Sequence, residues 1–174
     1  MASTLTAAGL GVTFGNAKHM LSLFNGSGSN RVLRVYRAWI LNNQTAAVTG
    51  VLTTFSMRKT SAQSSGTAVT PTKHDSANPN LPAQVLCAAG ATITNTADAP
   101  FRQWMWSNDE PSASSATSDE LECLVPLNCI WDSTGDSNIE PIVLRPGEGI
   151  TLQHTGSTTV GLCDLFLEFT DSAS

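Results

Sequence analysis

The stretch IEPIVLRPGEGITLQHTGSTTVGLCDLFLEFT, residues 139–170, decides the fold because apolar and polar side chains alternate on both sides of a turn. Ile142 and Leu144 alternate before RPGEG. Ile150 and Leu152 alternate after it. A period of two places successive side chains on opposite faces of a strand, and Pro next to Gly marks a turn. The stretch therefore predicts a closing antiparallel hairpin.

The end of the same stretch predicts one more strand. Leu165, Leu167 and Phe169 fall on one face of this strand. Phe166 and Glu168 fall on the other face. Similar runs, bounded by turn-forming residues, recur along the chain. We expect strands at residues 18–24, 31–41, 51–57, 84–96, 101–107, 121–127 and 129–132.

The run RVLRVYRAWIL fits two structures. Its apolar positions match a helical stripe, but it is also rich in β-branched and aromatic residues and is bounded by turn formers. The strands expected around it favour a strand here too. In that strand Leu33, Val35 and Trp39 would share one face. Tyr36 and Ile40 would lie on the other.

Short strands joined by turns and by two long loops leave little room for helices. We therefore predict an all-β chain that folds as an antiparallel β-sandwich, jelly-roll-like, with long loops and an extended N-terminal arm. At 174 residues the chain suffices for one domain. We assign residues 18–174 to a single sandwich domain and residues 1–17 to the arm.

The predicted arm carries no charged residue, consists mostly of small side chains and contains several glycines. A terminal segment of this kind normally frays unless something holds it. Leu5, Leu10 and Phe14 would supply apolar contacts. We therefore predict that residues 1–17 dock on a partner molecule.

The composition is unusually poor in charge. Charged residues make up 13% of the chain, against roughly 25% in ordinary soluble domains, while 19 Ser and 21 Thr occur among the 174 residues. Few charges would have to be desolvated if another surface covered such a molecule. A β protein with Thr-rich strands is the alternative explanation, and the sequence leaves both open.

Charge and hydropathy argue against two classes of partner. The net charge of −5 and the pI near 5.0 disfavour nucleic-acid binding, which needs a basic stripe. Arg31, Arg34 and Arg37 are the nearest approach to one. No apolar run reaches the ~20 residues that cross a bilayer, so we expect no membrane partner.

The four cysteines predict no metal site. Cys87, Cys123, Cys129 and Cys163 form no CxxC pair and have no His at metal-binding spacing. We expect buried, reduced thiols. His154 follows the alternation of its strand, which is typical of a hydrogen-bonded structural side chain rather than of a ligand.

Two acidic groups are weak candidates for chemistry, and we predict neither a catalytic residue nor a cofactor. Hard oxygen ligands can hold calcium, but an ordinary Asp/Asn turn fits the first group better. Paired carboxylates can hydrolyse glycosides, but the second group flanks a Ser-rich loop and is expected to be solvated. The first group is Asp132, Asp136, Asn138 and Glu140, and the second is Asp109, Glu110, Asp119, Glu120 and Glu122.

The run FRQWMWS is the strongest candidate for a contact surface. Arg102, Trp104 and Trp106 share one face of the expected strand, whereas Phe101, Gln103 and Met105 share the other. Whichever face points outward exposes large side chains, and exposed Trp beside Arg is enriched in protein interfaces. We take Arg102, Trp104 and Trp106 as predicted interface residues. Burial of the outward set under the chain's own long loop is the alternative.

The segments LFNGSGSNRVLRVYRAWILNNQTAAVTGVLTTFSMRK, GTAVTPTKHDSANPNLP, WSNDEP and EPIVLRPGEGITLQHTG together resemble small virion structural proteins of tailed bacteriophages. The resemblance implies a jelly-roll-like sandwich that attaches to a phage particle, and it supplies no catalytic residues. A head decoration (cement) protein of this kind is often trimeric and clamps neighbouring capsomers. A tail or fibre component would look similar.

Three hypotheses follow. The first is a non-enzymatic capsid decoration protein, located on the virion, homotrimeric, and bound to the major capsid protein or another virion protein. The second is a tail- or fibre-associated sandwich that binds a receptor or glycan through Trp104 and Trp106. The third is a glycan-cleaving enzyme that uses the carboxylates around Glu120.

Overall fold

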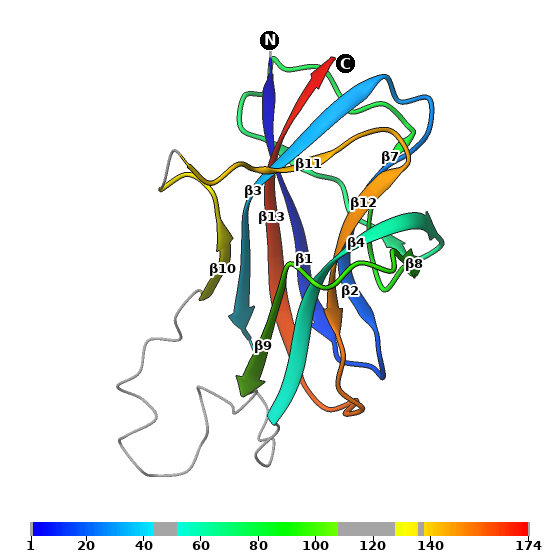
Figure 1. The fold of residues 1–174 in the computed structure, drawn as a ribbon. Helices are drawn as coiled ribbons and strands as arrows, with labels where there is room; N and C mark the ends of the chain where they lie inside the picture. The colour runs from blue at the N-terminus through cyan, green and yellow to red at the C-terminus, as the bar shows by residue number, and fades with distance from the viewer. Residues whose placement is uncertain (1, 44–51, 108–127, 136–137, 174) are drawn as a thin grey trace.

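The computed structural model describes residues 2–43, 52–107, 128–135 and 138–173. These residues form strands and turns, and no helix occurs among them. The strands build two antiparallel sheets that pack face to face (Figure 1). The predicted all-β antiparallel sandwich is therefore confirmed. The strand predicted at 121–127 lies outside the described residues.

The first sheet has six strands in the order β10–β3–β13–β1–β6, with β11 next to β10 along the same edge of β3. Its long strands are β1, β3 and β13, and the others are short edge strands. Their bounds are β1 Ser3–Thr13, β3 Arg31–Asn42, β6 Thr72–Lys73, β10 Asn128–Asp132, β11 Ile142–Leu144 and β13 Leu162–Ala173.

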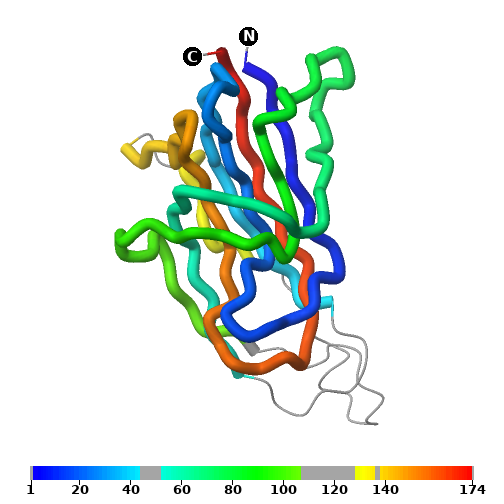
Figure 2. The backbone as a smooth tube through the Cα atoms, turned by 90° about the vertical axis from the view of Figure 1, so that its right-hand side faces the viewer, coloured from blue at the N-terminus to red at the C-terminus, as the bar shows by residue number. Residues whose placement is uncertain are grey.

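The second sheet has seven strands in the order β5–β7–β2–β12–β4–β8, with β9 beside β8 along the edge of β4. The two chain ends leave the sandwich at the same end (Figure 2). The bounds are β2 His19–Asn25, β4 Leu52–Ser64, β5 Thr67–Ala68, β7 Val85–Ala89, β8 Thr92–Asn95, β9 Arg102–Ser107 and β12 Glu148–His154.

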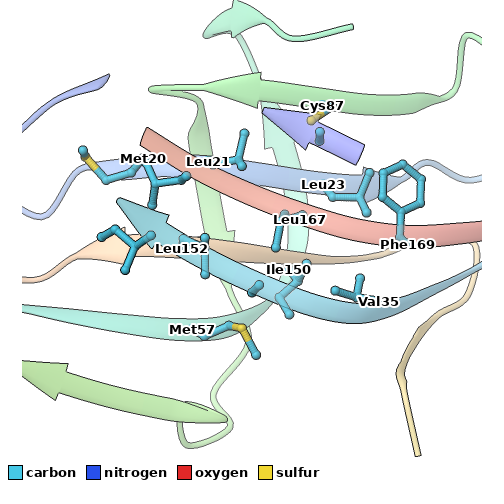
Figure 3. Close-up of a cluster of buried hydrophobic side chains, with 14 of the residues drawn as sticks. Met20, Leu21, Leu23, Val35, Met57, Cys87, Ile150, Leu152, Leu167 and Phe169 are labelled. Atoms are coloured by element: carbon cyan, nitrogen blue, oxygen red, sulfur yellow. The ribbon is translucent and has the colours of Figure 1, made fainter. Parts of the chain in front are cut away.

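The interior lies between the sheets and is apolar. In β13, Leu165, Leu167 and Phe169 are fully buried, as the alternation predicted. Figure 3 shows residues of the second sheet such as Ile150 close to Leu167 of the first. Burial of this apolar area is the main force that holds the two sheets together.

The predicted closing hairpin is wrong in its pairing. β11 pairs with β3 in the six-stranded sheet, whereas β12 pairs with β2 and β4 in the seven-stranded sheet. The RPGEG turn therefore crosses from one sheet to the other. The turn is held by the Glu148 side chain, which accepts a hydrogen bond from the Arg145 N–H at 2.8 Å. Gly147, at φ 91°, supplies the left-handed residue that the turn needs.

Residues 3–13 form a strand inside the sheet rather than an arm that leaves the domain. β1 pairs with β13 from Ser3 to Thr13. Leu5 and Ala7 point into the core and are 2% and 0% exposed. An uncharged, alternating segment becomes ordered here because its own sheet offers an unpaired strand edge and an apolar interior. The boundary predicted between residues 17 and 18 therefore cuts through the sandwich.

The expected strand at 31–41 is confirmed as β3, but its two faces differ from the prediction. Arg37 pairs with Glu168 and Val35 with Phe169, so Tyr36 is an extra residue in the ladder. Such a β-bulge shifts the alternation by one residue. Val35 and Ile40 consequently both face the core, and Trp39 faces outward.

Candidate contact surfaces

Trp104 and Trp106 of β9 pack inside the sandwich. Both contact Phe55 of β4, with ring centroids 5.7 Å and 6.3 Å away, respectively. Trp106 is 7% exposed. The larger side chains of β9 take the inner side because their burial removes more apolar area from water. Of the predicted interface residues on this strand, only Arg102 is exposed.

The outer face of β9 carries an exposed apolar group, which we call the β4–β9 strip. It consists of Leu52, Phe101 and Met105, which are 65%, 39% and 65% exposed. Met105 pairs with Thr54, two residues from Leu52 on β4, so the strip spans neighbouring strands. Leu52 and Met105 are diagonal neighbours in this ladder, whereas Phe101 lies four residues before Met105, with the exposed Gln103 between them. Exposed apolar side chains of this size on adjacent strands are typical of a surface that another molecule covers.

The strip continues around the sandwich edge toward the other sheet. The ring of Phe101 lies 6.3 Å from the ring of Trp131 in β10. The Arg102 guanidinium lies 5.8 Å from the same indole, within the range of a cation–π contact. Arg102 is thus held at the rim of the apolar strip, where a charged group can bind a partner without being fully desolvated.

The outer face of the six-stranded sheet forms a second surface, which we call the β3–β13 face. It comprises Thr6 of β1, Arg37 and Trp39 of β3, and Phe166 and Glu168 of β13. The strand register places Trp39 opposite Phe166 and Arg37 opposite Glu168. The five side chains line a hollow of about 50 Å³.

Arg37 is the electrostatic centre of the β3–β13 face. It forms ion pairs with Asp132 and Glu168, each at 3.5 Å, and donates a hydrogen bond to the Thr134 hydroxyl at 2.7 Å. Half-exposed ion pairs of this length contribute little to stability. They do give the floor of the hollow one positive and one negative group.

Among the three predicted arm residues, only Leu10 remains available to a partner. Leu5 and Phe14 belong to the core, with 2% and 4% exposure. Leu10 is 66% exposed because β1 bulges between Gly9 and Val12. Gly11, at φ 59°, donates its N–H to Asp164 at 2.6 Å within this bulge.

The calcium candidate does not assemble in the described part of the chain. Asp132 accepts two hydrogen bonds from Thr134, at 2.7 Å from the backbone and 2.6 Å from the hydroxyl. These hydrogen bonds, helped by Arg37, hold the pKa of Asp132 below its usual value. This is the ordinary Asp turn that the sequence favoured. No group of three metal-ligating side chains occurs in residues 2–43, 52–107, 128–135 and 138–173.

The second acidic group and one cysteine lie outside the described residues. Residues 108–127 contain this whole group, which is Asp109, Glu110, Asp119, Glu120 and Glu122, and they also contain Cys123. Asp136, of the first acidic group, lies in a second gap.

The other three thiols, those of Cys87, Cys129 and Cys163, are free. Cys87 and Cys163 are buried as expected, and burial raises the pKa of Cys87 to about 12. Cys129 is exposed, because it lies on the edge strand β10.

His154 is a structural side chain, as its position in the alternation predicted. It is fully buried, and its ring stacks on Phe14 at 4.9 Å. Nδ1 donates to the Gly15 carbonyl at 2.7 Å, so Nε2 accepts from the Thr53 hydroxyl at 2.6 Å. Burial lowers the pKa of His154, and the Gly15 hydrogen bond offsets only part of that effect.

This lowered pKa predicts that the fold loses stability in mild acid. The unfolded chain takes up a proton near pH 6.5, while the folded chain keeps His154 neutral to lower pH. The contribution of His154 to the free energy of unfolding is therefore fully present above about pH 6.5. It is lost as the pH falls toward the lowered pKa of the folded state. Urea unfolding at several pH values should show a smaller pH dependence in His154→Gln than in the wild type.

A second histidine, His19, also contributes to the pH dependence of wild-type stability. Burial, with the nearby Arg58, also lowers the pKa of His19, so His154→Gln should retain part of the slope. An additional His19→Gln change should reduce the slope further. Identical slopes in the wild type and in His154→Gln would contradict the role given to the buried ring.

No helix that could span a membrane occurs among the described residues. A scan against protein-family models gave no match, and searches of curated proteins and of solved structures gave none either. The chain's own surfaces and its sequence pattern therefore carry the functional assignment.

Proposed function

We propose that this chain is a non-enzymatic structural protein of a tailed-bacteriophage virion, where it decorates and stabilises the head shell. The observation that carries the proposal is the β4–β9 strip, with Leu52 and Met105 each 65% exposed. Apolar side chains at the centre of a contact, with a charged rim such as Arg102, are the usual anatomy of a protein interface. The phage assignment rests on the resemblance of the sequence to virion proteins.

The low charge of the molecule supports the same function. A shell protein is covered on several sides, and a surface with 13% charged residues needs little desolvation when it is covered. We expect a homotrimer whose β4–β9 strip contacts the major capsid protein or another virion protein. Many weak contacts, repeated over a particle, add up to strong attachment.

The strand order supports the jelly-roll form of this proposal. The long strands β1, β2, β3 and β4 alternate between the two sheets, as do β12 and β13. A chain wound in this way is typical of two Greek keys folded against each other, which is the jelly-roll plan. Many viral capsid domains have that architecture.

The strip predicts a specific attachment defect. Replacing Leu52 and Met105 together with Asp should lower the number of copies per particle by about tenfold or more, because each change places a charge in an apolar contact. Quantitative mass spectrometry of purified particles measures this number. The melting temperature of the isolated protein should stay near that of the wild type, since both side chains are exposed.

Thr92→Asp provides the matched control, because Thr92 is exposed on β8, outside the strip. This variant should attach like the wild type. Wild-type copy numbers in the Leu52/Met105 variant would remove the strip from the proposal. The copy number itself distinguishes head from tail: a decoration protein is present in many copies, and a tail or fibre component in few.

A further inference from the structure

The β3–β13 face is built as two rows of side chains across three strands. The first row contains Trp39, Phe166 and Ala8, which the register places side by side. The second row contains Arg37, Glu168 and Thr6. One row is apolar and the other polar, and the hollow of about 50 Å³ is lined by both.

The hollow has the size of a substituent rather than of a whole ligand. A cavity that holds one water molecule has a volume of about 10–15 Å³. A hollow of about 50 Å³ therefore admits a few non-hydrogen atoms. The rest of a ligand would lie above the hollow, against Trp39 and Phe166. Both aromatic side chains are partly exposed there.

The polar row offers complementary groups. Arg37 has only donors, and its contact with Glu168 is long, at 3.5 Å. This contact uses Oε2 of Glu168, and within the described residues Oε1 forms no hydrogen bond or ion pair. The Thr6 hydroxyl lies 2.8 Å from Nε2 of His74, which orients it. The hollow therefore presents a donor, an acceptor and an apolar wall together.

Charge balance selects the class of ligand. Arg37 forms ion pairs with Asp132 as well as with Glu168, so the two carboxylates neutralise its charge and an anion gains no net electrostatic attraction. The guanidinium in turn opposes the binding of a cation at Glu168. A neutral group with one acceptor, one donor and one methyl fits all three parts of the hollow. The acetamido group has this composition.

We propose that the β3–β13 face binds an N-acetylated amino sugar, with the acetamido group seated in the hollow. The carbonyl accepts from Arg37, the N–H donates to Glu168, and the methyl packs against Trp39 and Phe166. The sugar ring lies on the exposed part of these aromatic side chains, whose faces suit its C–H groups. This site is separate from the β4–β9 strip, so it holds whether the protein sits on the head or the tail.

The test is titration of the purified full chain with N-acetylglucosamine, followed by saturation-transfer NMR and calorimetry. We expect a dissociation constant on the order of 1 mM, which is about 4 kcal/mol of binding free energy. Glucose, which lacks the acetamido group, should bind at least about tenfold more weakly. Equal binding of the two sugars would overturn the acetamido assignment.

Variants assign the binding to this face. Trp39→Leu keeps an apolar side chain but removes the aromatic ring, and Glu168→Ala removes the acceptor; each should weaken binding by about tenfold or more. Thr170→Ala, on the same face of β13 but outside the hollow, is the matched control and should bind like the wild type. Wild-type binding by Trp39→Leu would overturn the site.

A second copy of the chain is the competing occupant of this face. Light scattering that shows a dimer dissociated by Trp39→Leu, without any sugar binding, would overturn the proposal in favour of self-association. The particle assay separates this outcome from the proposed function. Trp39→Leu should leave the number of copies per particle unchanged, because Trp39 lies outside the β4–β9 strip.

Discussion

Phe55→Ala should lower the free energy of unfolding by about 3–5 kcal/mol, because it empties the aromatic centre of the sandwich. Phe55 is 0% exposed. Its ring lies 5.5 Å from that of Phe14 and 5.3 Å from that of His154. Together with the contacts to Trp104 and Trp106, these contacts join β4, β9, β12 and the residue that follows β1, so truncation leaves a cavity that no single strand can fill.

Urea denaturation followed by tryptophan fluorescence measures this effect, since Trp104 and Trp106 both contact the Phe55 ring. The unfolding midpoint should fall while the slope with urea stays the same. Thr54→Ala is the neighbouring control, because Thr54 points away from the core on the same strand. A loss below about 1 kcal/mol in Phe55→Ala would mean that the aromatic cluster repacks and does not organise the core.

Gly149→Ala should also destabilise the fold, by about 1–3 kcal/mol or more, through overpacking. A Cβ added at Gly149 would lie 2.7 Å from the Phe24 ring and 2.8 Å from the Leu23 carbonyl oxygen, and it would also clash with the Thr60 hydroxyl. Gly149 lies on β12 between β2 and β4. Because the obstacles come from both neighbouring strands, β12 cannot shift away from one without meeting the other.

Thermal unfolding gives the simplest comparison. Gly135→Ala is the matched control, because a Cβ there meets nothing within 4 Å and the residue has no left-handed φ. It should change stability by no more than about 0.5 kcal/mol. A melting temperature for Gly149→Ala equal to that of Gly135→Ala would show that the two flanking strands yield easily at this point.

The sequence predicted the strands better than it predicted their partners. The alternation of Ile142 and Leu144, and of Ile150 and Leu152, correctly gave two strands and a turn. It could not show that the turn joins different sheets, because a period of two fixes which side chains are buried but not which strand lies alongside. The hydrogen-bonding partners come from segments far away in the chain.

The surface residues were less predictable than the core. Phe166 and Glu168 alternated outward as expected, but Trp39 was assigned to the wrong face because nothing local signals the bulge at Tyr36. For FRQWMWS the alternation left both faces open. Contact with Phe55 decided that Trp104 and Trp106 point inward and Met105 outward.

The sequence by itself determined that this chain forms an all-β sandwich with a sparsely charged surface, because side-chain periodicity and composition are local properties. The tertiary structure alone decided that residues 3–13 complete a sheet, and that Trp39 and Phe166 meet Arg37 and Glu168 around one hollow. These groups come from strands more than 100 residues apart in the chain. Only the register between such strands, set by burial of the shared core, brings their side chains together.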